Sequence, residues 1–277
     1  MSPLCGFLCP LTGDHRRLED CIKCPSKCLE LPLLFALLEG TRTYMPRRYS
    51  VTEILKPPLV VHLERRVDFW TNPLSLLWAT FGSSWHALVA GQAKAMAGYD
   101  RVDREYSWED ENHFEQILDF PDGPVILHGT PDQYHYPTQT LTDYKTTKFW
   151  WTAKKILDGN WGETTYHWQI NIYRHYKFPQ CQHQQLVMLI KDHTSRIEKE
   201  WGARPVERVD VPIMLSAIVE AEVRRRITEI LAVPPRPCHL SEKWYNKDKE
   251  HYARCEDYCP CNFACEWYRE YKGLKYE

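Results

Sequence analysis

The chain has 277 residues, and 43% of them are hydrophobic. A chain of this length and composition can bury a sizeable core, which argues against disorder and allows one large domain with appendages. The formal net charge of −2 excludes a global attraction to nucleic acid, so any such binding would need local basic patches such as 153–155 and 223–227.

No membrane or export segment is visible in the sequence. The N-terminus lacks a basic start followed by an apolar run, and the most apolar segment, 31–38, is far too short to span a bilayer. We therefore expect a cytoplasmic protein with no membrane partner.

The cysteines gather near the two ends of the chain. Of 11 cysteines, five fall within residues 5–28 and five within 238–265, which leaves Cys181 alone in the middle. In a reducing compartment this clustering favours metal binding by thiolates over disulfides. We therefore divide the chain into a Cys-rich N-terminal segment (1–45), a core (46–235) and a Cys-rich C-terminal tail (236–277).

The first half of the core is predicted to contain helices followed by a hairpin. Residues 50–70 begin with a plausible N-cap at Ser50 or Thr52 and are interrupted by Pro57 and Pro58, which predicts a short helix, a break and a second helix. A further helix is expected within 72–96. Two strands then follow, separated by a short turn, at 124–136 and 140–147.

The second half alternates helix and strand. Residues 162–178 have helical spacing, 185–194 form an apolar strand run, and 214–231 form an amphipathic helix that 232–238 terminate. The chain is thus expected to be of mixed α/β class.

A group of charged residues occupies the predicted hairpin. Asp132 follows the apolar run of the first strand, and Asp143 and Lys145 stand two apart in the second, so the latter two share one face of the sheet. Two carboxylates suit Mg²⁺ or Mn²⁺, and such a metal would stabilise charge building on a phosphodiester. Lys145 could position a water molecule or stabilise the transition state.

The order of these motifs resembles the RecB-like branch of the PD-(D/E)xK nuclease superfamily. That branch has a Gly-x-x-x-His motif before the acidic pair and a Gln-x-x-x-Tyr motif on a helix after it. The matching residues are Gly82 and His86 in "FGSSWH", Asp132 in "GTPD", Asp143 and Lys145 in "DYK", and Gln169 and Tyr173 in "QINIY". The resemblance covers roughly residues 50–190. It implies a restriction-endonuclease-like core, with a central mixed sheet flanked by helices, between Cys-rich terminal metal-binding segments.

The resemblance also implies roles for these residues. His86 would be a metal ligand beside Asp132 and Asp143, with the backbone carbonyl of Tyr144 as a further ligand, and Lys145 would assist the water. Gln169 and Tyr173, four apart on one helical face, would orient the lysine or touch the DNA backbone. The segment "KFWW" at 148–151 is equally consistent with a DNA-stacking wall and with core packing.

The expected function is that of a metal-dependent DNA nuclease. The resemblance implies hydrolysis of phosphodiester bonds by an exonuclease or end-processing enzyme in recombination, repair or phage DNA metabolism, with a helicase or recombination protein as a further partner. The alternative is a nucleic-acid-binding subunit of a larger recombination or CRISPR-adaptation complex, with little activity alone.

The cysteine clusters suggest separate metal sites. Several RecB-like nucleases hold an iron–sulfur cluster with three C-terminal cysteines and one distant N-terminal cysteine, and the tail looks similar, with Cys255, Cys259 and Cys265. Because residues 50–63 contain no cysteine, Cys238 or an N-terminal thiol would have to be the fourth ligand of a [4Fe–4S] cluster or Zn²⁺. At the N-terminus two close pairs favour a small zinc knuckle, with Cys28 spare or lent to the other cluster. The pairs are Cys5 with Cys9 and Cys21 with Cys24.

Overall fold

The computed structural model describes residues 4–26, 28–30, 32–34, 37, 44–74, 76–77, 80–82, 84–85, 88–89, 108–110, 113–247 and 250–273. The chain divides into two compact units. Unit 1 comprises Met1–Pro46, Lys56–Thr80 and Arg225–Glu277, and unit 2 comprises Arg47–Leu55 and Phe81–Arg224. Residues 56–80 and 225–235, which the sequence division assigns to the core, thus group with the terminal segments.

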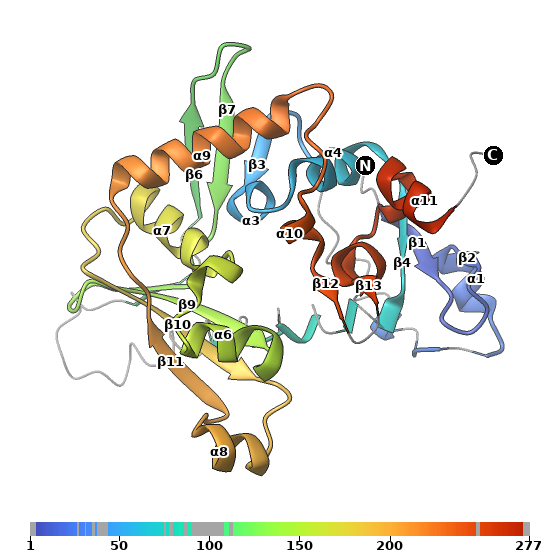
Figure 1. The fold of residues 1–277 in the computed structure, drawn as a ribbon, viewed down its shortest axis with the longest axis horizontal. Helices are drawn as coiled ribbons and strands as arrows, with labels where there is room; N and C mark the ends of the chain where they lie inside the picture. The colour runs from blue at the N-terminus through green and yellow to red at the C-terminus, as the bar shows by residue number, and fades with distance from the viewer. Residues whose placement is uncertain are drawn as a thin grey trace. The chain divides into compact units, whose positions relative to one another are not determined.

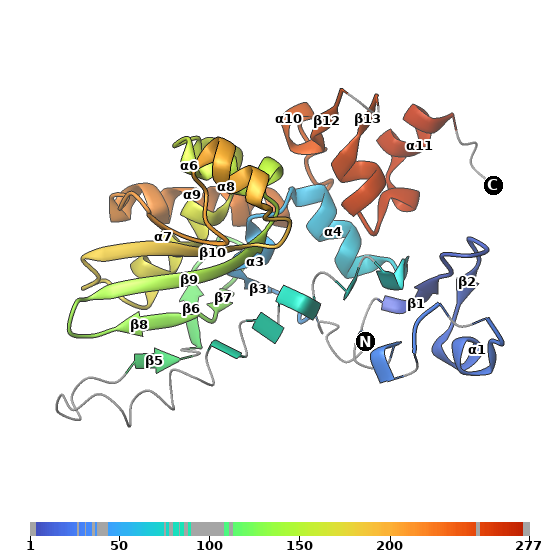
Figure 2. The ribbon, with the colours of Figure 1, turned by 90° about the horizontal axis from the view of Figure 1, so that it is seen from below.

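Unit 2 is built on a five-stranded mixed sheet in the order β11-β10-β9-β8-β5. Its central strands β9 and β10 are parallel, and the other neighbouring pairs are antiparallel. The strands are β5 (Trp108–Asp110), β8 (Gln133–His135), β9 (Thr140–Thr147), β10 (His183–Ile190) and β11 (Val206–Asp210). The connection from β9 to β10 carries α6 (Lys154–Leu157) and α7 (Tyr166–Tyr176), which lie on one side of the sheet in Figure 2. The predicted hairpin is confirmed as β8 and β9.

A second sheet of unit 2 has three strands in the order β3-β7-β6 (Figure 1). They are β3 (Arg48–Ser50), β6 (Phe114–Leu118) and β7 (Val125–Gly129). The prediction of one strand over 124–136 is therefore wrong, because the run breaks after Gly129 and resumes in the other sheet at Gln133. Pro131 lies in this break and has no backbone N–H to donate to a strand ladder. The expectation of one central sheet is corrected accordingly, since several mixed sheets flanked by helices form this α/β fold.

The helices of unit 2 follow the local signals in the sequence. Ser50 caps α3 (Val51–Ile54) by accepting the N–H of Glu53, whose carboxylate in turn accepts the N–H of Ser50. After the break at Pro57 the second predicted helix is α4 (Pro58–Arg66), which belongs to unit 1. The predicted helices over 162–178 and 214–231 are confirmed as α7 and α9 (Ser216–Leu231), and α8 (Ser195–Trp201) follows β10.

The core of unit 2 lies against the central strands. Its fully buried side chains include Tyr134, Leu141, Ile170, Phe178 and Leu186. The rings of Tyr134 and Phe178 stack with centroids 4.1 Å apart, which ties β8 to the end of α7.

Unit 1 consists of small elements around the cysteines. Its strands are β1 (Leu4–Leu8), β2 (His15–Arg16) and β4 (Phe69–Thr71) in one sheet, and β12 (Tyr245–Asn246) and β13 (His251–Tyr252) in another. Its short helices are α1 (Leu18–Lys23), α10 (Leu240–Lys243) and α11 (Glu266–Lys272). Near the N-terminus, Phe7, Leu34 and Leu37 form a small hydrophobic core. In a unit with so few long elements, bound metal would contribute a large share of the folding free energy.

Within the described ranges, no helix is both long enough and apolar enough to cross a bilayer.

Candidate functional site

The break between β7 and β8 places Asp132 beside β9, just past the point where the pairing with β8 ends. Strand β8 pairs with β9 only as far as Gln133 opposite Thr142. Two residues further along β9, the N–H of Tyr144 donates to Asp132 Oδ2 at 2.7 Å. The carboxylate of Asp132 thus takes the place of a backbone carbonyl from a neighbouring strand. The N–H and C=O of one strand residue point to the same side, so the carbonyl of Tyr144 also faces Asp132.

Asp143 and Lys145 form a buried ion pair on β9. Lys145 Nζ lies 2.6 Å from Asp143 Oδ2, and the two side chains are 13% and 2% exposed. Burial alone would lower the pKa of Lys145, but the carboxylates of Asp143 and Asp132 outweigh it and hold that pKa above its usual value. Lys145 is therefore a fixed positive charge beside two carboxylates.

Helix α7 covers this pair with the predicted Gln169 and Tyr173. Gln169 Nε2 donates to the Tyr173 hydroxyl at 3.1 Å, and both side chains are buried. Burial raises the pKa of Tyr173 to about 12, and the charge of Asp143 adds to this effect. The phenol stays protonated at neutral pH and is a hydrogen-bond donor near the carboxylates.

Tyr166 is a site residue that the sequence reasoning missed. Lys145 Nζ lies 5.3 Å from the centre of its ring, and burial raises the pKa of its hydroxyl. Tyr166 precedes Gln169 by three residues and Tyr173 by seven, so it lies on the same helical face. Extending the Gln-x-x-x-Tyr motif back by one helical turn would have found it.

Two glycines allow the elements of the site to approach closely. A Cβ at Gly129 would lie 2.7 Å from Tyr173 Cε1, so β7 can pass α7 at this distance only with glycine. A Cβ at Gly82 would lie 3.1 Å from Thr146 Oγ1 on β9. His86, four residues after Gly82 in the sequence, lies outside the described residues, so its role as a ligand stays a prediction.

The donor set around β9 fits a hard divalent cation. The carboxylates of Asp132 and Asp143 and the carbonyl of Tyr144 are all oxygen donors, which Mg²⁺ and Mn²⁺ prefer. A carboxylate has about four lone-pair positions, so Asp143 can face both Lys145 and a metal.

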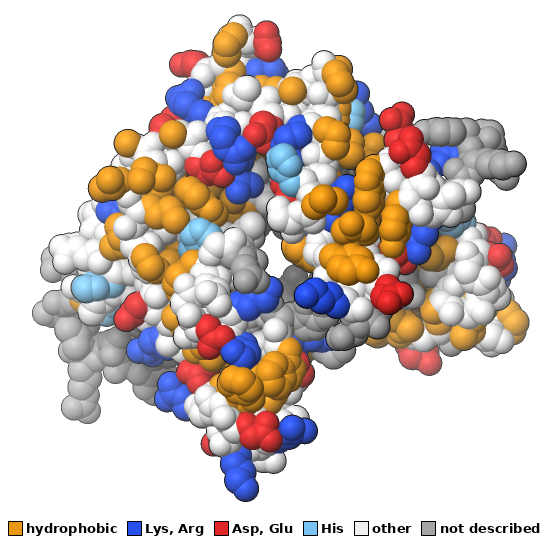
Figure 3. Space-filling view, in the orientation of Figure 1, with side chains coloured by type: hydrophobic (Ala, Val, Ile, Leu, Met, Phe, Trp, Pro, Cys, Tyr) orange, Lys and Arg blue, Asp and Glu red, His pale blue; other side chains and the backbone are white. Residues whose placement is uncertain are grey.

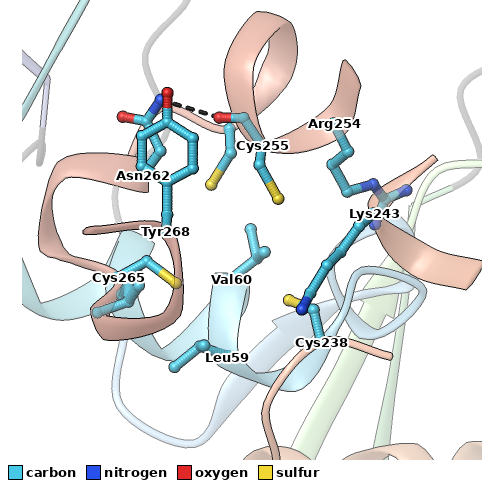
Figure 4. A pocket seen from close by; sticks show the side chains of 11 residues that line it. Leu59, Val60, Cys238, Lys243, Arg254, Cys255, Asn262, Cys265 and Tyr268 are labelled. Atoms are coloured by element: carbon cyan, nitrogen blue, oxygen red, sulfur yellow. Dashed lines mark hydrogen bonds between the residues drawn. The ribbon is translucent and has the colours of Figure 1, made fainter. Parts of the chain in front are cut away.

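A pocket in unit 1 brings the C-terminal cysteines together. Its lining includes Leu59 and Val60 of α4 and four thiols, those of Cys238, Cys255, Cys259 and Cys265. Figure 4 shows the side chains of Cys238, Cys255 and Cys265 directed toward the same space. The sequence left either Cys238 or an N-terminal cysteine as the neighbour of the three close cysteines. In the structure it is Cys238 that lines the same pocket.

The thiols of this pocket are held close to one another in a poorly hydrated place. Burial, followed by neighbouring charges, raises the pKa of Cys238, Cys255 and Cys259 to about 11 in each case. The backbone N–H of Cys261 opposes this rise at Cys259. A bound cation would lower the pKa of these thiols, because it favours the thiolate form.

A buried lysine and a half-buried arginine also line the cysteine pocket. Lys243 is only 5% exposed, and its ammonium lies 3.2 Å from the centre of the Trp267 ring. The guanidinium carbon of Arg254 lies 3.9 Å from the centre of the Trp244 ring. Glu242 and the cysteines of the pocket are the opposite charges that act on Arg254, against the cost of its burial.

The N-terminal cysteines gather around α1. Burial raises the pKa of Cys21, and the thiols of Cys28, Cys24 and Cys9 add to this effect, so these four lie within electrostatic range. The hydroxyl of Thr12 and the backbone N–H groups of Leu11 and Thr12 lower the pKa of Cys9. The structure thus adds Cys28 to the expected set, and the side chain of Cys5 lies outside what is described.

None of these groups has the finished geometry of a metal site. Within the part of the chain that the structure describes, no three His, Cys, Asp or Glu side chains are arranged to hold a metal ion as they stand.

Comparisons with known proteins show the fold but no family. No protein-family model matches the chain, and no curated protein matches it. The crystal structure of SSO0001 is similar with a TM-score of 0.53 at 15% sequence identity, over 84% of this chain and 94% of that chain. A phage-related exonuclease from Haemophilus somnus 129PT gives a TM-score of 0.31 at 12% identity, over 53% of this chain and 67% of that chain. The first similarity shows a fold shared with SSO0001, whereas the second is too weak to support a conclusion.

Proposed function

We propose that the chain is a metal-dependent DNA nuclease of the RecB-like type that hydrolyses phosphodiester bonds at or near DNA ends. The observation that carries the proposal is the ion pair of Asp143 and Lys145 on β9, with the half-buried Asp132 beside it where the pairing with β8 ends. Burying the carboxylate of Asp143 with an ammonium group is costly for stability alone, so the cluster fits a catalytic role better than a structural one.

The residues of the cluster have complementary parts in the reaction. Asp132, Asp143, the carbonyl of Tyr144 and the predicted ligand His86 would hold Mg²⁺ or Mn²⁺, which supplies charge neutralisation and favours deprotonated water. Water adds to phosphorus, the bond to the leaving oxygen breaks, and that oxygen takes up a proton.

Lys145 acts in this reaction as a fixed cation. Its ammonium stabilises the negative charge that builds on the non-bridging phosphate oxygens, because its high pKa keeps it protonated. Gln169 and Tyr173 hold the wall of the site from α7, and Tyr166 limits the positions that the ammonium can take.

A digestion of labelled DNA tests the function. We expect the purified protein with Mg²⁺ or Mn²⁺ to degrade end-labelled linear DNA and to spare covalently closed circles. Asp143→Asn and Lys145→Met should each lower the rate by a factor on the order of 100 or more. Asp210→Asn, a matched change of an exposed carboxylate on β11, should leave the rate unchanged.

The outcome separates the nuclease from its alternative. Full activity of Asp143→Asn would refute the site assignment. DNA binding without cleavage by the wild type would instead favour the binding subunit, and a pulldown from the native cell would then identify the helicase or recombination partner.

We further propose that the cysteine clusters hold structural metal in a cytoplasmic, reducing environment. The described cysteines form no disulfide. Cys238, Cys255, Cys259 and Cys265 would bind a [4Fe–4S] cluster or Zn²⁺. Cys9, Cys21, Cys24 and Cys28, with Cys5 as the remaining N-terminal thiol, would bind Zn²⁺.

Metal analysis of anaerobically purified protein tests this second proposal. Iron with a broad visible absorption would identify a cluster, and zinc without colour would identify Zn²⁺. Cys259→Ser should reduce both metal content and thermal stability, whereas Cys181→Ser, a matched change of the buried cysteine in unit 2, should keep the metal. Soluble, active protein without zinc or iron would refute it.

A further inference from the structure

Two tryptophan side chains are exposed together on unit 2. Trp150 is 53% exposed and Trp201 is 47% exposed. Their ring centres are 5.4 Å apart, and the ring planes are nearly perpendicular at 87°. Figure 3 shows hydrophobic side chains gathered over the region of α6 and α8, with both basic and acidic side chains around them. Exposed apolar side chains that gather into one patch often mark a binding site.

The two rings are held in place from below and from the side. Phe149, which is 1% exposed, lies with its ring centre 5.0 Å from that of Trp150 and 6.2 Å from that of Trp201. Phe149 and Trp150 belong to a π-helical turn, Phe149–Ala153. Lys154 Nζ lies 4.5 Å from the centre of the Trp201 ring. The rings thus form a rigid platform that loses little entropy on binding.

Two lysines lie together at the carboxyl ends of the parallel strands beside this platform. Lys148 follows Thr147 and Lys191 follows Ile190, residues that are paired in the β9–β10 register. The N–H of Lys191 donates to the carbonyl of Thr147 at 2.9 Å, so the two backbones stay together past the strand ends. Adjacent strands are about 4.8 Å apart, and like charges across such a pair are unfavourable.

Lys191 lies near both a like charge and a carboxylate. Burial lowers the pKa of Lys191, the charge of Lys148 lowers it further, and Asp192 opposes both effects. One oxygen of Asp192 already accepts the N–H of Phe149 at 2.7 Å. A phosphate near the two ammonium groups would relieve their repulsion.

The platform is within reach of the cleavage site along one strand of the sheet. Lys148 follows Lys145 by three residues, and Trp150 follows it by five. The Cα atoms of Lys145 and Trp150 are therefore at most about 17 Å apart. A DNA strand in a duplex advances about 3.4 Å per nucleotide, so this upper limit corresponds to at most about five nucleotides.

We propose that this surface binds single-stranded DNA adjoining the cleavage site, with bases stacked on Trp150 and Trp201 and phosphates at Lys148 and Lys191. The inference rests on the proposed nuclease function and adds the form of its substrate. Aromatic rings next to cationic side chains are the usual means of holding a single strand without regard to sequence, whereas a duplex keeps the faces of its bases stacked inside.

The test measures binding, not cleavage. Every variant carries Asp143→Asn and is studied without divalent metal, so that a failure of the nuclease proposal is scored separately in the digestion assay. Fluorescence anisotropy of a labelled oligothymidine should give about tenfold weaker binding for Trp150→Ala with Trp201→Ala. Replacement of both by Phe should restore most of the affinity, and Tyr136→Ala, an exposed aromatic near the other end of β9, should change nothing.

The lysines are tested through the salt dependence. Lys148→Glu with Lys191→Glu should weaken binding and reduce the slope of log affinity against log salt by about 1.4. The matched control is Arg208→Glu, an exposed charge reversal on β11, which should leave the slope unchanged.

Three results would overturn the proposal. The first is unchanged single-strand affinity in the tryptophan variants. The second is an equal loss of affinity for a hairpin-closed duplex. The third is a change of oligomeric state without a change of DNA affinity, which would show that the platform binds protein. If the alanine variants fail to fold by circular dichroism, the Phe and lysine variants decide the question.

Discussion

Neutralising the two members of the buried ion pair on β9 one at a time should cost more stability than neutralising both. Asp143→Asn leaves the ammonium of Lys145 buried, with Asp132 as its remaining opposite charge, and Lys145→Met leaves a carboxylate that is 2% exposed. Removing one partner of a buried pair typically costs 3–5 kcal/mol, and the attraction of Asp132 places Asp143→Asn near about 3 kcal/mol. The double variant has neither charge and should fall within about 1 kcal/mol of the wild type.

Thermal and urea unfolding measure this cycle. A loss of about 3 kcal/mol should lower the melting temperature by roughly 6–10 °C for a chain of this size. The interaction energy is the difference between the double variant and the sum of the two single variants.

Mn²⁺ adds a second measurement to the same cycle. A ligand at 100 times its Kd stabilises the folded state by about 2.7 kcal/mol. The wild type and Lys145→Met should gain this stability, because both carboxylates remain, and the double variant should not. Single variants within about 0.5 kcal/mol of the wild type, or additive effects in the double variant, would refute the ion-pair reasoning. A gain from Mn²⁺ that does not depend on Asp143 would refute the metal site.

The remaining predictions concern one glycine and two charged residues of unit 1. Gly129→Ala should lower the free energy of unfolding by about 1–3 kcal/mol in urea, because its Cβ would lie 2.7 Å from a buried tyrosine ring carbon, whereas Gly162→Ala, with open space around it, should not. Lys243→Met should weaken retention of the metal by about tenfold in a chelator competition, and unchanged retention would show that its charge is irrelevant to the pocket. Burial would raise the pKa of Glu242, but Arg236, with bonds of 3.0 and 3.1 Å, holds that pKa below its usual range. The pair of Arg236 and Glu242 should therefore add about 1 kcal/mol to the free energy of unfolding above roughly pH 4.3, and this contribution should be lost as the pH falls further. Glu242→Gln should be less stable than the wild type at pH 7 and equally stable at low pH.

Local signals in the sequence predicted the elements that carry the site. Pro57 and Pro58 marked the break between α3 and α4, and helical spacing marked α7 and α9, because these features depend on neighbouring residues only. The strand break at Pro131 carried a local signal too, yet the apolar run around it concealed a change from one sheet to another.

Other features depend on contacts that the sequence does not contain. Trp150 and Trp201 come together only after β10 and α8 fold back beside the end of β9, and no periodicity joins them. Spacing likewise could not show which further cysteine lies near the close C-terminal ones, whereas the pocket lining includes Cys238. The metal roles of these cysteines and of His86 stay predictions.

The parallel pairing of β9 and β10 has a consequence for how the protein folds. Asp132 and Asp143 lie within one hairpin, a contact that can form early because little chain separates them. Tyr166, Gln169 and Tyr173 belong to the crossover between β9 and β10, and they reach the carboxylates only when β10 has docked in parallel register, a slow step with a large loss of chain entropy. During synthesis the two carboxylates would thus come together first and stay exposed to water until β10 emerges. The complete site, and any cleavage that depends on it, would form only after β10 has paired with β9 and α7 has docked.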